Sequence, residues 1–240
     1  MSGWVLATRA ADELAPIAAA LAARGVEVVA MPLLREAAVD DAEGRAAVER
    51  ALPTIRMTAF TSKRAPAALR RAAPDLAAEL AARPAAAVGE ATAAAARRER
   101  FAVAVVGQGG GEALAGALAG RLQPGDAVVH PCGREHRAEL SDALARAGFE
   151  VLPFVVYAME EIPAGEAPPL PAGRPAAVVL TSPRAVAAYL DRSGARWADV
   201  PHLAIGATTA AADAAAGVYA RPAAQPTTES IVEELCQICS

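Results

Sequence analysis

The amino-acid sequence contains an internal repeat, and this repeat limits the possible folds more than any other feature. Its copies are separated by roughly 120 residues, far more than the 20–50 residues of a solenoid repeat. A repeat of that length indicates a duplicated domain. Two similar domains in one chain form a cleft, which is where ligands usually bind. Residues 5–9 and 21–29 return as 128–132 and 144–152, residues 60–69 return as 180–189, and residues 87–95 return as 204–212.

Composition restricts the classes of protein to consider. Of the 240 residues, 54% are hydrophobic and only 4% are aromatic, so the cores must be built mainly from Val, Leu, Ile and Ala. The net charge of −4 argues against nucleic acid as a partner, because phosphate binding needs a basic face. An anionic small molecule stays compatible with this charge, since helix N-termini bind anions through backbone amides.

Targeting signals are also missing from the sequence. It contains no apolar run of about 18 residues, which argues against a membrane-spanning helix. The first residues resemble a strand and lack the basic and apolar regions of a signal peptide. Cys132, Cys236 and Cys239 form no disulfide framework. Together these features predict a cytoplasmic protein.

Short apolar segments alternate with Ala-rich helical segments, which predicts parallel sheets covered by helices on both faces. Asp12 is expected to cap the first helix, and Gly25 is expected to end it. The expected strands are 3–7, 26–30, 58–61, 85–88, 103–106, 127–130, 150–156, 176–181, 202–205 and 218–220.

The position of polar linkers predicts that one domain is inserted into the other. Residues 123–126 between the two repeats make a tight turn, whereas 32–43 and 157–173 are longer polar stretches. We therefore expect a discontinuous domain 1, residues 1–35 and 160–240, and an inserted domain 2, residues 38–157. Each domain is expected to hold five strands in the order 2-1-3-4-5.

A Thr-Ser-x-Arg motif occurs once in each repeat, directly after an apolar strand. Its first residues are Thr61 and Ser62 in one copy and Thr181 and Ser182 in the other. Serine is a good N-cap and Pro183 suits the first helical position, so capping alone could explain the motif. The same geometry also supplies an anion site at the carboxyl end of a parallel strand. The presence of two copies favours that interpretation.

Further strand-to-helix turns carry glycine or threonine. Glycine lets a ligand approach the backbone closely, although a tight turn with a Thr cap explains the same residues. The Gly-rich stretch 106–112 resembles a dinucleotide loop but lacks the following strand with a ribose-binding acid, so it does not predict a nucleotide site. The residues at these turns are Gly89, Thr92, Gly206, Thr208, Thr209, Thr227 and Thr228.

Tyr157 lies at the end of a predicted strand, where the chain crosses between the domains. It is either a half-buried packing residue or a phenol that donates a proton in the cleft. The three histidines lack the spacing of a zinc site. The Cys236-x-x-Cys239 motif lies near the C-terminus and not after a first strand, so we interpret it as incidental. No metal and no cofactor are expected.

These segments, in this order, are similar to the uroporphyrinogen-III synthase family. The resemblance covers nearly the whole chain. It implies two flavodoxin-like doubly wound α/β domains, one inserted in the other, joined by a two-stranded connector. It also implies cyclisation of the linear tetrapyrrole hydroxymethylbilane to uroporphyrinogen III, with loss of water and inversion of ring D. The segments that carry it are 5–9, 60–65, 87–92, 154–157, 180–186, 204–209 and 226–230.

The resemblance also implies roles for single residues. Tyr157 matches a candidate proton donor to the leaving hydroxyl, and Arg9 matches a basic position near the cleft. Hydroxyls and amides would meet substrate carboxylates at Ser62, Thr181, Ser182, Gly206, Thr208, Thr209, Thr227 and Thr228. Lys63 stands where the family often has proline, as at Pro183.

The family implies a monomer that works without a cofactor, and it is compatible with transient contact with the upstream deaminase. Two alternatives stay open at this point. The first is a non-catalytic two-domain protein that binds or senses a small molecule. The second is a nucleotide-dependent oxidoreductase or methyltransferase, which rests on Gly107–Gly111 alone.

Overall fold

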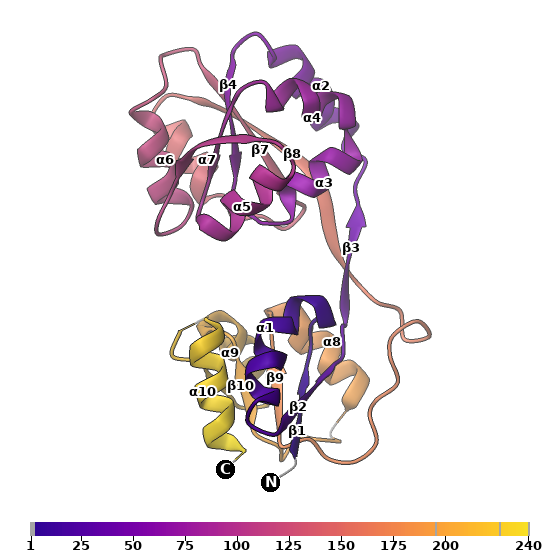
Figure 1. Ribbon diagram of the computed structural model, residues 1–240. Helices are drawn as coiled ribbons and strands as arrows, with labels where there is room; N and C mark the ends of the chain where they lie inside the picture. Colours follow the sequence, from indigo (N-terminus) through magenta and orange to yellow (C-terminus); the bar gives the residue numbers. More distant parts are fainter. Residues whose placement is uncertain (1–2, 195, 226, 240) are drawn as a thin grey trace. The chain divides into compact units, whose positions relative to one another are not determined.

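The computed structural model describes residues 3–194, 196–225 and 227–239. The chain divides into two compact units (Figure 1). Residues 1–35 and 160–240 form the first, here called the terminal unit, and residues 36–159 form the second, the inserted unit. The boundaries fall inside the strands β3 (Leu34–Ala38) and β8 (Glu150–Glu161).

The terminal unit contains a five-stranded parallel sheet in the order β11-β10-β9-β1-β2. Numbered within the unit, this is the predicted order 2-1-3-4-5. Its strands are β1 (Gly3–Ala7), β2 (Val26–Ala30), β9 (Ala177–Leu180), β10 (His202–Ala204) and β11 (Ala220–Pro222), and its helices are α1 (Ala11–Ala22), α8 (Pro183–Ser193), α9 (Ala207–Ala215) and α10 (Thr228–Ile238).

The inserted unit is built on a six-stranded sheet in the order β3-β8-β7-β4-β5-β6. The pairs from β8 to β6 are parallel. Besides β3 and β8, its strands are β4 (Ile55–Phe60), β5 (Pro84–Ala87), β6 (Ala102–Val106) and β7 (Ala127–Gly133), and its helices are α2 (Ala42–Ala51), α3 (Ala65–Ala72), α4 (Pro74–Ala81), α5 (Glu90–Arg98), α6 (Gly111–Ala119) and α7 (Glu139–Arg146).

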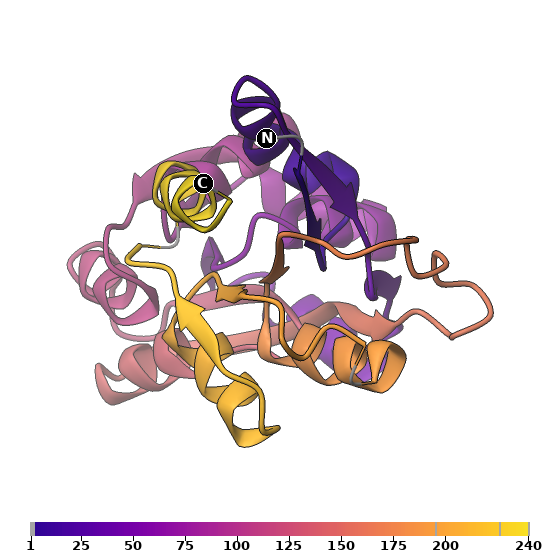
Figure 2. The same cartoon turned by 90° about the horizontal axis from the view of Figure 1, so that it is seen from below.

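Helices cover both faces of each sheet, as the near-continuous apolar strands predict. In the inserted unit α3 and α4 lie on one face and α6 and α7 on the other (Figure 1). In the terminal unit α1 and α10 pack together on one face, and α8 and α9 cover the opposite one (Figure 2). Small Ala and Val side chains fill more than half of the buried strand positions, which lets helices approach the sheet closely.

The two units exchange halves of the sequence repeat. Strands β1 and β2 correspond in sequence to β7 and β8, and β9 to β11 correspond to β4 to β6. Each unit therefore combines the first half of one repeat with the second half of the other. As a result, the corresponding strands have the same neighbours in both sheets, but in the inserted unit their order along the chain is permuted. The predicted order 2-1-3-4-5 is therefore wrong for that unit.

Local differences from the expected elements have physical causes. Helix α1 begins at Ala11 without a side-chain cap, and Asp12 lies in its first turn rather than capping it. Gly25 adopts a φ of +75° and ends the helix region as predicted. Strand β3 was not among the expected strands. Its sequence Leu-Arg-Glu-Ala-Ala lacks a continuous apolar pattern, because all five residues are partly or fully exposed. Among the helices of the described residues, none has the length and apolar character required to cross a membrane.

Candidate functional site

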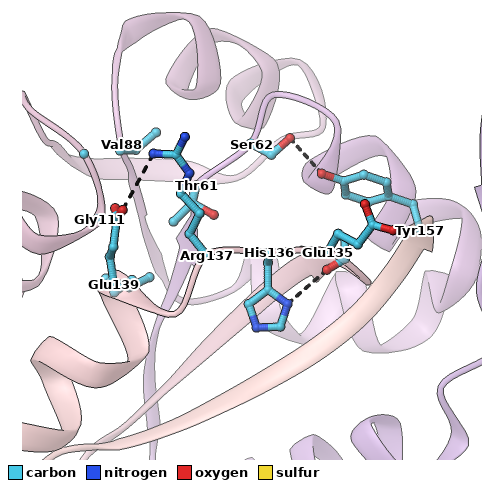
Figure 3. Close-up of a pocket in the computed structure, with 12 residues that line it drawn as sticks. Thr61, Ser62, Val88, Gly111, Glu135, His136, Arg137, Glu139 and Tyr157 are labelled. Carbon is cyan, nitrogen blue, oxygen red and sulfur yellow. Dashed lines mark hydrogen bonds and ion pairs between the residues drawn. The ribbon is translucent and has the colours of Figure 1, made fainter. Parts of the chain in front are cut away.

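A cavity of about 290 Å³ opens in the inserted unit where several parallel strands end (Figure 3). Loops after β4, β5 and β7, together with the starts of α6 and α7, form its wall. Carboxyl ends of parallel strands are the usual place for a ligand site in such folds. The lining residues are Thr61, Ser62, Val88, Gly110, Gly111, Gly133, Glu135, His136, Arg137, Glu139, Leu140 and Tyr157.

Tyr157 and Ser62 meet at this cavity (Figure 3). The Tyr157 hydroxyl donates a hydrogen bond of 3.0 Å to Oγ of Ser62. Tyr157 lies on β8 and is paired in register with Gly133 of β7, next to an irregularity in the ladder. A Cβ atom at Gly133 would lie 2.8 Å from Cζ of the tyrosine ring. The ring can therefore occupy this position only because residue 133 is glycine.

Burial raises the pKa of Tyr157. The hydrogen bond to Ser62 and the positive charge of Arg64 oppose this shift but do not cancel it. The phenol is consequently protonated at neutral pH. It is a hydrogen-bond donor, and it can act as a proton donor to a group that develops negative charge.

Ser62 and its counterpart Ser182 differ in their local role. Ser182 is the N-cap of α8, and its side chain accepts a hydrogen bond of 3.2 Å from the backbone N–H of Ala185. In the inserted unit α3 begins only at Ala65, and Ser62 accepts from the backbone N–H of Arg64 at 3.2 Å. Ser62 therefore does not cap the helix and its side chain faces the cavity and Tyr157.

Thr61, the other predicted hydroxyl of this motif, pairs with a buried histidine. Its Oγ1 lies 2.9 Å from Nε2 of His130, which is fully buried on β7. Burial lowers the pKa of His130 to about 4, and the neighbouring His136 contributes to this shift. The imidazole is therefore neutral near pH 7 and holds Thr61 by a hydrogen bond between uncharged groups.

The rim of the cavity carries charge of both signs. His136 points its Nδ1 at the carbonyl oxygen of Gly133, 3.0 Å away. Arg137 lies 3.6 Å from the carboxylate of Glu139, and its side chain is 78% exposed. A pair this exposed is weakly held, so Arg137 can turn to an anionic ligand at little cost.

In the terminal unit, the hydroxyls of Thr181, Ser182 and Thr227 are engaged by the protein itself. Thr181 is buried and donates to the carbonyl of Thr8 at 3.0 Å. Thr227 is the N-cap of α10 and accepts from the N–H of Ser230 at 3.3 Å. Arg9 pairs with Glu13 at 3.6 Å. The others in this unit lie at helix starts: Gly206 is the N-cap of α9, Thr208 is exposed, Thr209 is buried and Thr228 is partly buried.

Comparison with known proteins gives a family. A sequence model described as uroporphyrinogen-III synthase HemD matches residues 15–233. The chain belongs to the uroporphyrinogen-III synthase family. No curated protein matches it. Among solved structures, the uroporphyrinogen-III synthetase from Helicobacter pylori matches with a TM-score of 0.71 at 18% identity, covering 99% of this chain and 100% of that one.

A second solved structure agrees with the same fold. A mutant uroporphyrinogen III synthase from the extremely thermophilic bacterium Thermus thermophilus matches with a TM-score of 0.59 at 19% identity, covering 99% of this chain and 98% of that one. At such identity the likeness shows the α/β fold with its parallel sheets, which confirms the fold class. As a uroporphyrinogen-III synthase family member, the protein is an enzyme of tetrapyrrole biosynthesis.

Within this family member, three of the predicted site residues meet at the cavity: Thr61, Ser62 and Tyr157. Gly89 and Thr92 belong to the same unit but do not line it; Thr92 is buried in α5. Sequence reasoning missed His136, Arg137 and Glu139. His136 and Arg137 lie in a polar segment between β7 and α7, and Glu139 begins α7. This segment carries no motif, and only its position after a central parallel strand could have indicated it.

Proposed function

We propose that this protein cyclises hydroxymethylbilane to uroporphyrinogen III with loss of water and inversion of ring D, and that it acts as a lyase without a cofactor. The family match carries the proposal. The cavity supports it because its polar groups can position an anion and deliver one proton, and such a reaction needs little more. The linear substrate also closes without an enzyme to the wrong isomer, so the enzyme's main task is positioning.

Tyr157 is the proposed proton donor to the leaving hydroxyl. Without substrate its O–H donates to Ser62 at 3.0 Å. A leaving hydroxyl placed beside Ser62 would accept the same proton. The raised pKa of Tyr157 keeps the phenol protonated before the reaction. Loss of water then leaves an electrophilic azafulvenium end, and the electron-rich substituted carbon of the last ring attacks it to form the new carbon–carbon bond.

The size of the cavity indicates how the substrate is held. At about 290 Å³ it lies at the lower limit for a pocket that holds a whole small molecule. A linear tetrapyrrole has four rings, so we propose that this cavity holds only one end of it. Arg137 and the hydroxyl of Thr61 are then the donors for its carboxylates.

Substrate-binding roles are proposed for the predicted residues outside the cavity as well. Thr208 and Thr227 are exposed and offer hydroxyls at helix starts in the terminal unit. We further propose a cytoplasmic monomer that receives its unstable substrate through transient contact with the upstream deaminase. The remaining residues in this set are Arg9, Gly89, Thr92, Thr181, Ser182, Gly206, Thr209 and Thr228.

An isomer assay tests the reaction directly. Freshly made hydroxymethylbilane is supplied to the protein, the product is oxidised, and isomers I and III are separated by chromatography. The expected result is predominant isomer III at a rate proportional to protein concentration. Isomer I alone, at the rate without protein, would overturn the proposal and favour a protein that only binds the tetrapyrrole.

A further inference from the structure

A second group of reactive side chains lies next to the cavity, on and after β7. His130 and Cys132 are buried on the strand, and His136 follows three residues after its end. Each of the three offers one ligand atom, and these atoms all lie within 4.8 Å of one another. The rings of His130 and His136 meet edge to face with centroids 5.5 Å apart.

In each of the two histidine rings, a hydrogen bond occupies one nitrogen and leaves the other able to bind a metal ion. His130 uses Nε2 to bond Thr61, while its buried Nδ1 has no hydrogen-bond partner among the described residues. His136 uses Nδ1 to bond the carbonyl of Gly133, which leaves Nε2. A buried polar atom without a partner is rare and costs free energy. A histidine that donates one N–H to an oxygen and leaves the other nitrogen bare is the usual arrangement of a metal ligand.

We propose that His130, Cys132 and His136 bind a zinc ion, with His130 Nδ1, Cys132 Sγ and His136 Nε2 as ligands. One thiolate and two imidazoles are a ligand set that zinc accepts in sites with an open fourth position. Zinc bonds of 2.0–2.3 Å place tetrahedral ligand atoms about 3.3–3.6 Å apart. His136 lies in a loop, so its ring can move inward to bring the ligand atoms to these distances.

The metal would reach the site through the cavity, because His136 is one of the lining residues. On binding, the Cys132 thiol releases its proton to solvent and its sulfur forms the bond to zinc. Zinc on Nδ1 of His130 also fixes the proton on Nε2. That N–H then donates to Thr61, whose own hydroxyl hydrogen is free to face the cavity. The three ligands belong to the cluster alone, and the metal site is independent of the proposed reaction.

Cobalt(II) binding to the intact chain tests the proposal. Cobalt(II) takes zinc sites, and a thiolate ligand gives an intense charge-transfer band in the near ultraviolet. The matched control is the double variant C236S/C239S, since this pair is the other source of thiolate in the chain. The test variants are C132S and H136N; H136N alters a loop residue, so it is the safer one for folding, which circular dichroism checks.

The expected result is a cobalt–thiolate band in the wild type and in the control, and none in C132S. H136N should weaken cobalt binding by about 100-fold, since even outer-shell changes cost 10–100-fold. Zinc should displace the cobalt and raise the melting temperature of the wild type. The proposal is overturned if the wild type gives no band, if H136N binds cobalt as the wild type does, or if the band disappears in the control. These readouts do not involve catalysis.

Discussion

The carboxyl ends of the corresponding strands β9 and β4 differ between the two units. Hydrogen bonds fill the end of β9 in the terminal unit, whereas the end of β4 in the inserted unit lines a cavity. In the terminal unit Thr181 donates to the carbonyl of Thr8 at 3.0 Å, and Thr8 donates to the carbonyl of Val179 at 3.2 Å. In the inserted unit Thr61, which corresponds to Thr181, bonds the His130 ring instead and faces a cavity. The matched threonines thus tie two strands together in one unit and line a pocket in the other.

The difference follows from the residues opposite the threonine. By the repeat, Ala7 corresponds to His130 and Ala10 to Gly133. The histidine ring takes the hydrogen bond of the Thr61 hydroxyl, and the glycine makes room for the ring of Tyr157. A duplicated scaffold can therefore acquire a pocket in one copy through a few changes at a strand end, without any change of fold.

The largest expected effect is a loss of turnover when Tyr157, which has its role only in the inserted unit, is changed. Tyr157→Phe should lower kcat by about 10²–10⁴-fold, because the proposed proton donor is removed. The melting temperature should change little, since the ring stays in place. The measurement is turnover of hydroxymethylbilane to isomer III by chromatography.

Tyr189→Phe is the matched control for that change. Tyr189 is buried in the terminal unit, and its hydroxyl contacts His202 at 3.3 Å. The kcat of the Tyr189→Phe variant should equal that of the wild type. A Tyr157→Phe protein with unchanged kcat would remove the phenol from the mechanism while leaving the family assignment intact.

Gly133→Ala installs the residue of the terminal unit at the matched position. Its Cβ would lie 2.8 Å from Cζ of Tyr157, so the ring must move away from Ser62. Crowding of this kind destabilises by about 1–3 kcal/mol, and turnover should fall together with stability. Urea unfolding and the isomer assay measure both; a variant with wild-type stability would show that the ring has room to spare.

Asp213→Ala should make the protein more stable. Asp213 is fully buried in α9 and neither carboxylate oxygen has a hydrogen-bond partner among the described residues, whereas the matching residue of the inserted unit is Ala96. An unpaired buried polar group costs roughly 1–3 kcal/mol. Removing it should raise the free energy of unfolding near pH 7 by an amount within that range.

The stability that Asp213→Ala adds should decrease as the pH is lowered. Burial raises the pKa of Asp213 in the folded state. Between the unfolded and folded pKa values the folded protein binds more protons, so this group destabilises increasingly as the pH rises through that window. The advantage of Asp213→Ala should therefore shrink as the pH falls toward 4, and an advantage that grows in acid would contradict this account.

The smallest expected effects are those of alanine substitutions at Ser182 and Ser62, which should differ in kind. Ser182→Ala removes an N-cap and should cost about 1 kcal/mol of stability. Ser62→Ala removes no helix cap, so it should cost less stability but lower turnover through Tyr157. Thermal unfolding and kinetics on both proteins would reveal this crossed pattern; equal losses of stability would mean that Ser62 also caps its helix.

Much of the fold was predictable because the apolar strands are short and lie between clear helix signals. Strands β1 and β2 match their expected bounds, and the ends of the other expected strands lie within five residues of those observed. Strand β3 is missing from the strands expected from the apolar pattern, since Arg35 and Glu36 interrupt that pattern. The permuted strand order of the inserted unit was also missed, because a repeat does not reveal which halves will pair in space.

The site was predictable where a motif repeats and not elsewhere. Thr61 and Ser62 stood out as half of a duplicated pair, and Tyr157 as a rare aromatic at a strand end. Gly89 and Thr92 shared that kind of signal, yet they do not line the cavity. His130 and Cys132 gave no sequence signal, because their spacing to His136 follows no standard metal motif. Their proximity to His136 depends on how the chain bends after β7.

The exchange of repeat halves has a consequence for the order in which the chain folds on the ribosome. All strands from β4 to β8 are made consecutively, whereas β1 and β2 must wait for β9, which begins at Ala177. At 5–20 residues per second the ribosome needs roughly 7–30 s to span that gap. During this interval an unpaired edge of β1 is exposed, and the inserted unit can complete its own sheet first. Nascent chains whose residues up to 165 have left the ribosome should therefore already protect the inserted unit from proteases while residues 1–30 are still cleaved.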